Sequence, residues 1–191
     1  MAAPLAGLSS SIHDLAGRSS AFDKLMSFAA QDLIFVVLLV FAVLWFRPDG
    51  LRAGIAAGAG AAIALVIAGI IGDIHYVARP FVAQHYAPLF AHADDASFPS
   101  DHLCALGAIA AGAWFSVRLL GLATAAVAVV VGFARVYAGV HDVADVGAGF
   151  LIGAACGTAV WYGLRPLMPL VDRVDAELQR AGLRRRSASV Q

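Results

Sequence analysis

Long apolar runs alternate with short polar segments along the chain. A helix needs about 20 mostly apolar residues to cross the hydrocarbon core of a membrane. Five runs reach or approach that length, at Phe28–Phe46, Ala53–Ile71, Leu103–Val117, Leu119–Val136 and Val143–Leu164. Strand-like alternation bounded by turns is not visible, and helices satisfy their own backbone hydrogen bonds in lipid. The pattern therefore predicts an all-α protein, a polytopic bundle of about five transmembrane helices.

Two weaker patterns flank the predicted spans. Residues 5–25 are weakly amphipathic, which predicts an N-terminal interfacial helix on the outer membrane surface. Residues 169–186 place apolar side chains at helical spacing with arginines between them, which predicts a helix on the inner surface, with a frayed tail as the alternative. We therefore expect a membrane domain over residues 1–166 and a basic amphipathic tail over residues 167–191.

Composition narrows the class of protein. Hydrophobic residues make up 61% of the chain and charged residues 14%, whereas a soluble domain carries about 25% charged residues. The 13 Lys and Arg balance the 13 Asp and Glu, so the chain lacks the net positive charge typical of a nucleic-acid-binding protein. An integral membrane protein with no nucleic-acid partner is the class that fits.

The basic residues predict the orientation in the membrane, because cytoplasmic loops are richer in Lys and Arg than outer loops. If the spans alternate in direction, nine basic residues share one side and four share the other. The nine are Arg47, Arg52, Arg118, Arg165, Arg173, Arg180, Arg184, Arg185 and Arg186, and the four are Arg18, Lys24, Arg79 and Arg135. The richer side is then cytoplasmic, and segments 73–100 and 137–142 face outward.

Polar residues gather at the predicted outer ends of the spans. They are Asp73, His75 and Arg79 after the second span, Ser97, Ser100, Asp101 and His102 before the third, and Arg135, His141, Asp142 and Asp145 between the fourth and fifth. Polar groups at this depth are costly and usually functional. Taken singly, each has an ordinary interpretation, such as a headgroup anchor or a helix cap. Together, on one face of the membrane, they predict a single site.

Three of these residues suit an anion. Arg79 and Arg135 are fixed cations that can fork onto phosphate oxygens. Ser100 stands at the N-cap position of the third span, where a hydroxyl, free N–H groups and the helix dipole all favour negative charge. We therefore expect these three side chains to bind phosphate.

A reactive imidazole is predicted beside them. His141 and Asp145 are four residues apart, so their side chains meet if a helix begins near His141. The carboxylate would hold one ring nitrogen and leave the other as a nucleophile, while His102 could protonate a leaving oxygen. A divalent metal held by His141, Asp142 and Asp145 is the alternative. The lack of tightly spaced histidine pairs and the nearby arginines favour a site with no metal and no other cofactor.

These residues resemble three motifs of the type 2 phosphatidic acid phosphatase (PAP2) superfamily, in the same order and spacing, between residues 70 and 160. Arg79-Pro80 resembles the end of its first motif, Lys-x6-Arg-Pro. Residues 99–102 resemble its Pro-Ser-Gly-His motif, and residues 135–145 resemble its third motif, Arg-x5-His-x3-Asp. The stretch 92–102 is also similar to the bacitracin-resistance type of undecaprenyl-diphosphate phosphatase in that superfamily.

The resemblance implies a PAP2/haloperoxidase-like bundle that hydrolyses its substrate without a metal, in two steps through a phosphohistidine. His141 would be the nucleophile, Asp145 would orient it, and His102 would protonate the departing oxygen and then activate water. Three residues would hold the phosphoryl oxygens: Arg79, Ser100 and Arg135. The substrate would be undecaprenyl diphosphate, hydrolysed to undecaprenyl phosphate and phosphate on the outer side of the bacterial inner membrane, which recycles the lipid carrier of cell-wall polymers.

Two positions depart from the superfamily pattern. Gly72 stands where the first motif has its lysine and cannot bind phosphate through a side chain. His75 is the predicted substitute, because in a helical stretch it would share a face with Arg79. Asp101 replaces a glycine of the second motif, and the sequence leaves its role open.

Other functions also stay open. Phosphatidic acid, phosphatidylglycerophosphate or a phosphorylated polyprenyl sugar could be the substrate, because all would use the same catalytic residues. A lipid or anion transporter could use the same arginines, although the spans show no inverted repeat. Gly149, Gly153 and Gly157 allow close helix packing, which favours contacts within the chain over a homo-oligomer interface. Segment 81–99 could act as a lid.

Overall fold

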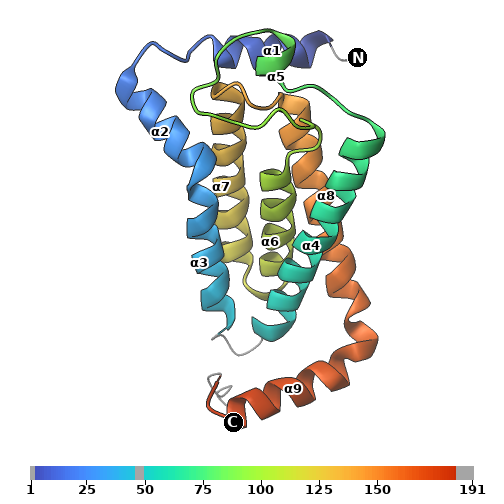
Figure 1. Ribbon diagram of the computed structural model, residues 1–191. Coiled ribbons are helices and arrows are strands. Elements are labelled where there is room, and N and C mark those ends of the chain that lie inside the picture. The colour runs from blue at the N-terminus through green and yellow to red at the C-terminus, as the bar shows by residue number, and fades with distance from the viewer. Residues whose placement is uncertain (1–2, 46–49, 184–191) are drawn as a thin grey trace.

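The computed structural model describes residues 3–45 and 50–183, and every regular element in that part of the chain is a helix (Figure 1). The helices are α1 Ala3–His13, α2 Ser20–Gln31, α3 Leu33–Trp45, α4 Gly50–Ile74, α5 Pro80–Ala83, α6 Asp101–Ser116, α7 Arg118–Tyr137, α8 Val143–Gly163 and α9 Met168–Arg180, with a 3₁₀ turn, η1 Arg165–Leu167, before α9. The predicted all-α class is confirmed.

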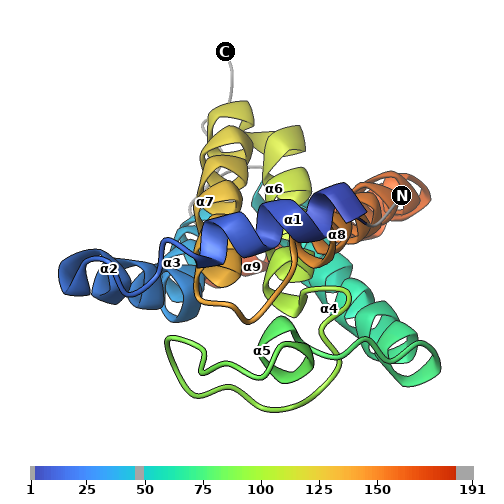
Figure 2. The same cartoon turned by 90° about the horizontal axis from the view of Figure 1, so that it is seen from above.

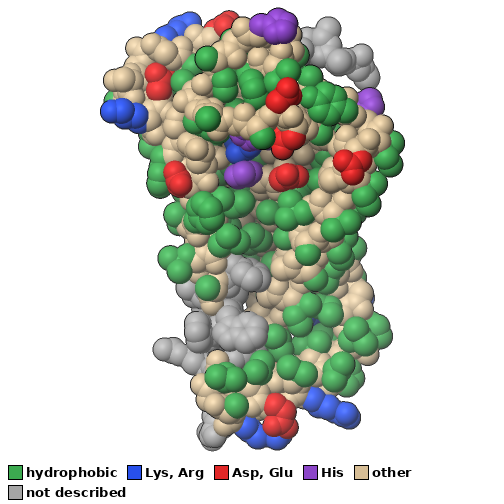
Figure 3. Space-filling view, in the orientation of Figure 1, with side chains coloured by type: hydrophobic (Ala, Val, Ile, Leu, Met, Phe, Trp, Pro, Cys, Tyr) green, Lys and Arg blue, Asp and Glu red, His purple; other side chains and the backbone are tan. Residues whose placement is uncertain are grey.

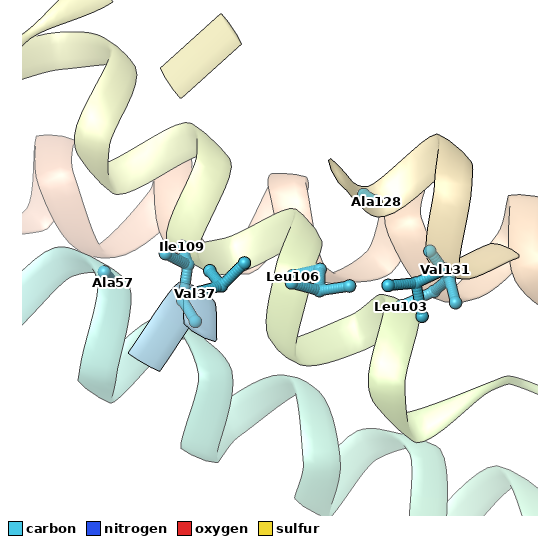
Figure 4. Close-up of a cluster of buried hydrophobic side chains, with 7 residues drawn as sticks. All are labelled: Val37, Ala57, Leu103, Leu106, Ile109, Ala128 and Val131. Atoms are coloured by element: carbon cyan, nitrogen blue, oxygen red, sulfur yellow. The ribbon is translucent and has the colours of Figure 1, made fainter. Parts of the chain in front are cut away.

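Helix α6 stands at the centre of the bundle and packs against α4, α7 and α8 (Figures 1 and 2). Apolar side chains from α3, α4, α6 and α7 meet in a buried core (Figure 4). The core comprises Val37, Ala57, Leu103, Leu106, Ile109, Ala128 and Val131. Because α6 and α8 both begin at the same end of the bundle, the positive ends of both helix dipoles point there.

Close packing between α6 and α8 depends on glycine. A Cβ atom on Gly149 would lie 2.5 Å from the carbonyl oxygen of Ser100, and one on Gly157 would lie 2.6 Å from that of Ala108. A Cβ on Gly153, between them, would overlap the backbone of Cys104. The glycine stripe therefore serves packing within the chain, as predicted.

Three of the predicted spans are helices long and apolar enough to cross a membrane: α4, α7 and α8. Helix α6, with 16 residues, matches the third predicted run but is shorter. The first run falls across α2 and α3, because the helix is interrupted at Asp32, and its last residue, Phe46, lies outside the described part of the chain. The count of five spans stays a prediction.

The outer surface of the helices is apolar. Leu39, Val66, Val129 and Leu151 project from α3, α4, α7 and α8 with exposed fractions of 63% to 72%. Figure 3 shows the same apolar band over the middle of the molecule, with charged side chains toward the two ends. A surface of this kind suits lipid rather than water.

The two ends of the bundle carry different elements. Helix α1 and segment 75–100 lie at the end where α6 and α8 begin, and α9 lies at the opposite end (Figure 1). All three predicted polar groups therefore share one end. Arg47 and Arg184–Arg186, which contribute to the predicted orientation, lie outside the described residues.

Helix α1 is bound to the turn between α7 and α8, and Figure 2 shows it crossing above these helices. The Oγ atom of Ser9 accepts a hydrogen bond from the backbone N of Val143 at 3.0 Å. The Nδ1 atom of His13 lies 3.0 Å from the carbonyl oxygen of Tyr137, and its ring stacks on Tyr86. The N-terminal segment thus holds the turn from outside.

Candidate active site

The turn between α7 and α8 positions His141. Gly139 has a φ of 78°, a left-handed conformation that favours glycine, and it lets the chain reverse between the two helices. His141 is 2% exposed and Asp145, in the first turn of α8, is 3% exposed. Their Nδ1 and Oδ2 atoms lie 3.5 Å apart, and Oδ2 also accepts a hydrogen bond from the backbone N of Asp142 at 2.8 Å. The predicted pairing of His141 with Asp145 is confirmed.

Ser97 completes the support on this side of the imidazole. Its hydroxyl donates to Oδ2 of Asp145 at 2.6 Å and lies 3.4 Å from Nδ1 of His141. Two oxygen atoms therefore face Nδ1. Both oxygens can accept a hydrogen bond from Nδ1–H. They therefore favour the tautomer in which Nδ1 carries the hydrogen and Nε2 does not.

Two buried guanidiniums converge on the other ring nitrogen. Nη1 of Arg79 lies 3.1 Å from Nε2 of His141, and Nη2 of Arg135 lies 3.2 Å from it. Arginine can only donate, so Nε2 is the acceptor toward Arg135, whereas Nη1 of Arg79 also lies 3.5 Å from Nδ1 and approaches both ring nitrogens. Burial and the charges of Arg135 and Arg79 hold the pKa of His141 well below its usual value. The result is a neutral imidazole beside two buried cations, an arrangement that could act as a nucleophile toward a bound anion.

Backbone carbonyl groups fix both arginines. Nη1 of Arg79 donates to the carbonyl oxygen of Val140 at 3.0 Å, and Nη2 donates to that of Ala96 at 3.3 Å. Nη1 of Arg135 donates to the carbonyl oxygen of Ala30 at 3.0 Å, at the end of α2. These neutral partners orient the guanidiniums without cancelling their charge.

Two side chains of segment 75–100 reach the arginines from outside. Oδ1 of Asp95 accepts a hydrogen bond from Nε of Arg79 at 2.7 Å. Partial burial raises the pKa of Asp95, but the hydrogen bond and charge of Arg79 outweigh burial, so this pKa is lowered. Nε2 of His92 lies 3.1 Å from Nη2 of Arg135. Burial, together with the charges of Arg79 and Arg135, lowers the pKa of His92.

Ser100 lies where the sequence predicts it, at the N-cap of α6, fully buried. Its backbone N donates to the carbonyl oxygen of Asp145 at 3.1 Å, which joins the starts of α6 and α8. Within the described residues, Oγ of Ser100 and Nε of Arg135 are buried without a hydrogen-bond partner. An unpaired buried polar group costs about 1–3 kcal/mol, a cost that a bound phosphate would offset.

The other predicted residues, His102, His75 and Asp101, differ in whether they lie near the site. His102, the second residue of α6, is half-buried and interacts electrostatically with Arg135 and His141. The placement expected for His75 is wrong: α4 ends at Ile74, the following residues are not helical, and the His75 side chain is exposed. The helical face that would have carried it beside Arg79 does not exist. Asp101 is exposed at the first position of α6.

Sequence reasoning missed His92 and Asp95 as members of the site, and it placed Ser97 in the polar group without giving it a role. All three lie in the stretch 92–102, and the resemblance of this stretch to one type of phosphatase could have pointed to them. Their contacts depend on the path of an irregular segment, which periodicity does not describe. No group of three or more His, Cys, Asp or Glu within the described residues is arranged to hold a metal ion.

The polar cluster opens on one side of the molecule. In Figure 3, histidine and Lys or Arg side chains show near the top of this face, with acidic side chains beside them and the apolar band below. A separate apolar groove of about 600 Å³ lies between α7 and α8, and Leu8 and Ile12 of α1 also line it. None of the charged residues of the cluster lines that groove.

The family model described as "PAP2 superfamily" matches residues 53–168. The chain belongs to the PAP2 superfamily. The match includes each motif of the cluster, from Arg79 to Asp145. As a member of this superfamily with several apolar helices, the chain is an integral membrane phosphatase that hydrolyses lipid phosphates.

Among curated PAP2 relatives, undecaprenyl-diphosphatase BcrC of Bacillus subtilis (strain 168) is 32% identical over 169 residues, covering 85% of this chain and 86% of the relative. Putative undecaprenyl-diphosphatase YbjG of Escherichia coli (strain K12) is 34% identical over 149 residues, 74% of each chain. A protein named bacitracin transport permease protein BcrC, from Bacillus licheniformis, is 27% identical over 176 residues, 87% of each chain.

A solved PAP2 structure has the same fold. The crystal structure of Aquifex aeolicus LpxE superimposes with a TM-score of 0.67 at 24% sequence identity, and covers 81% of this chain and 92% of that protein. At this identity the likeness concerns the fold. It agrees with the helix bundle described above.

Proposed function

We propose that this PAP2 protein hydrolyses undecaprenyl diphosphate to undecaprenyl phosphate and phosphate, at the outer face of the bacterial inner membrane. The observation that carries the proposal is the convergence of two buried guanidiniums on Nε2 of His141, at 3.1 and 3.2 Å. A phosphoryl group placed there would meet a nucleophile and two cations at once. Two relatives named as undecaprenyl-diphosphatases, one of them putative, support the choice of substrate.

In the first step, Nε2 of His141 attacks the terminal phosphorus. The N–P bond forms as the bond from phosphorus to the bridging oxygen breaks, and His102 donates a proton to the departing oxygen. Arg79 and Arg135 stabilise the charge that spreads over the equatorial oxygens, as preorganised cations do in phosphoryl transfer. Ser100 adds a hydroxyl donor from the start of α6.

In the second step, water attacks the phosphohistidine. His102, now neutral, takes a proton from the water as its oxygen bonds to phosphorus, and the N–P bond breaks. Inorganic phosphate leaves, and His141 returns to its neutral form. Asp145 and Ser97 keep Nδ1 of His141 hydrogen-bonded through both steps. Only Nε2 therefore forms and breaks a bond to phosphorus.

The position of the cluster suits a substrate with an anionic head and a long apolar tail. The cationic side chains lie at one end of a bundle whose outward-facing surface is apolar. A diphosphate head can occupy the cluster while the prenyl tail remains beside the helices in the bilayer. Other lipid phosphates share this property. A transported lipid would share it too, and one relative is named as a transport permease.

The test is phosphate release by the purified protein in detergent. With undecaprenyl diphosphate and excess chelator, we expect release by the wild type and a loss of at least about a thousandfold in His141→Ala, since the nucleophile is gone. Substrate labelled in the terminal phosphate should leave acid-labile label on the wild type only. Higher kcat/KM on phosphatidic acid, phosphatidylglycerophosphate or a polyprenyl sugar phosphate would contradict the substrate. Full biological activity of His141→Ala would favour transport.

A further inference from the structure

His92 contacts Arg135 in the site, but it has no role in the two-step reaction above. One atom of Arg135, Nη2, lies 3.1 Å from Nε2 of His92 and 3.2 Å from Nε2 of His141. The centroids of the two imidazole rings are 6.4 Å apart. A single guanidinium nitrogen therefore bridges the nucleophile and a second imidazole.

The hydrogen bonds of His92 define its protonation in the absence of substrate. Its Nδ1 lies 3.1 Å from the carbonyl oxygen of Ala93, which can only accept, so Nδ1 carries the hydrogen. Nε2 then accepts from Arg135 and bears no proton. Because 19% of the side chain is exposed, a proton from solvent can reach this nitrogen.

Neighbouring side chains hold the ring at the mouth of the site. Phe81 and Phe90 approach it with ring centroids at 6.5 and 6.3 Å. Oδ1 of Asp95 lies 4.0 Å from Nδ1 of His92 and also accepts from Nε of Arg79. Two aromatic rings and the Asp95 carboxylate therefore lie next to the His92 ring, and the carboxylate can balance a positive charge on it.

We propose that His92 selects diphosphate over monophosphate substrates by taking up a proton when the substrate binds and donating a hydrogen bond from Nε2 to the phosphate that stays on the lipid. The attacked phosphate must sit against Nε2 of His141, between the two arginines. His92 contacts the same Nη2 atom of Arg135 and is more exposed than His141. The second phosphate of a diphosphate would extend toward it. The inference deepens the proposed function and rests on it, because a monophosphate has no group to place there.

Charge balance explains why the proton arrives with the substrate. The groups whose charges act on His92 are Arg79, Arg135, Asp95, His102 and His141. Without substrate, burial and the two arginines disfavour an imidazolium. A diphosphate brings enough negative charge to neutralise both guanidiniums, and the remaining Asp95 then favours the protonated ring.

The test compares two substrates with the same tail. In detergent, kcat/KM is measured for undecaprenyl diphosphate and undecaprenyl phosphate with wild type, His92→Ala and His92→Gln. Both variants should lose about ten- to a hundredfold on the diphosphate, the range expected for a charged hydrogen bond. They should lose less than about threefold on the monophosphate. His85→Asn is the matched control, because His85 is exposed in the same segment and Asn tolerates its positive φ of 57°.

Inhibition provides a second measurement, which does not require the monophosphate to be hydrolysed. Methylenediphosphonate should inhibit His92→Ala at least about tenfold more weakly than wild type, while inorganic phosphate inhibits both equally. Equal losses on both substrates, or unchanged inhibition by the diphosphonate, would overturn the role of His92 and leave the proposed function intact. A wild type that releases no phosphate from the diphosphate would overturn both. Equal thermal midpoints in detergent exclude a folding defect as the cause.

Discussion

The two ring nitrogens of His141 have different neighbours, although Nη1 of Arg79 also lies 3.5 Å from Nδ1. Oxygens of Asp145 and Ser97 lie 3.5 and 3.4 Å from Nδ1, whereas nitrogens of Arg79 and Arg135 lie 3.1 and 3.2 Å from Nε2. This asymmetry fixes which nitrogen holds the hydrogen before any substrate arrives. It also makes protonation of Nε2 costly, because the proton would enter a buried space already shared by two cations.

A pH titration tests this polarised imidazole. Since burial and both guanidiniums disfavour the imidazolium, the pKa of His141 is lowered and the ring stays neutral as the pH falls below about 6.5, the usual value. In nitrogen NMR of the histidine-labelled protein in detergent, the His141 signals should remain those of the neutral Nδ1–H form through that pH. His141→Gln assigns the signals. A His141 resonance that titrates at or above pH 6.5 would contradict the geometry.

At this scale, sequence reasoning found the groups whose partners are fixed by helical spacing or by helix ends. His141 and Asp145 meet because they are four residues apart at the start of α8, and Ser100 caps α6. The partners of Ser97 and His92 could not be found in that way, because their contacts depend on the path of an irregular segment. The error at His75 had a similar origin: nothing in the pattern marked the end of α4 at Ile74.

Among the helices, the contact between α6 and α8 determines the shape of the site. Gly149 lets α8 approach Ser100 so closely that the backbone N of Ser100 bonds to the carbonyl oxygen of Asp145. The N-cap of one helix and the first turn of the other are thereby joined. The apolar runs predicted each long helix, but they did not reveal which helices pair, since lipid-facing and buried apolar residues look alike in sequence.

Replacing Gly153 with alanine should loosen this pair. Its Cβ would overlap the Cys104 carbonyl and lie 2.9 Å from the backbone N of Ala108, so α6 and α8 would have to separate. We expect a loss of about 1–3 kcal/mol, typical of overpacking, seen as a lower thermal midpoint in detergent, together with reduced phosphatase activity.

Gly147 provides the matched control on the same helix. A Cβ there would meet nothing within 4 Å, and alanine is the better helix former. Gly147→Ala should therefore leave the thermal midpoint unchanged or slightly higher. If Gly147→Ala and Gly153→Ala lowered the midpoint equally, the cause would be a general effect on α8 and not its contact with α6.

On the scale of the whole molecule, the candidate site is confined to one end. The cluster and α1 lie where α6 and α8 begin, and the amphipathic α9 lies at the other end. The boundary predicted at residue 166 falls within η1, just before α9, and the division into a membrane domain and a tail stays a prediction. So does the assignment of the cluster to the outer face of the membrane.

Cysteine labelling in spheroplasts tests the orientation. In a Cys104→Ala, Cys156→Ala background, a membrane-impermeant maleimide should label Gln84→Cys at once, because this exposed position lies beside α5 at the end that carries the cluster. Glu177→Cys, exposed on α9, should react only after permeabilisation. The reverse pattern would place the phosphatase site in the cytoplasm and contradict recycling of a carrier on the outer face.

The attachment of α1 to the catalytic turn has a practical consequence for work with the protein. Ser9 and His13 contact the backbone on either side of His141, so the first helix lies directly against the turn that carries the proposed nucleophile. A purification tag or fusion partner joined in front of α1 adds bulk beside that turn. Tags placed beyond α9 are separated from it by the length of the bundle and are the sounder choice for kinetic measurements.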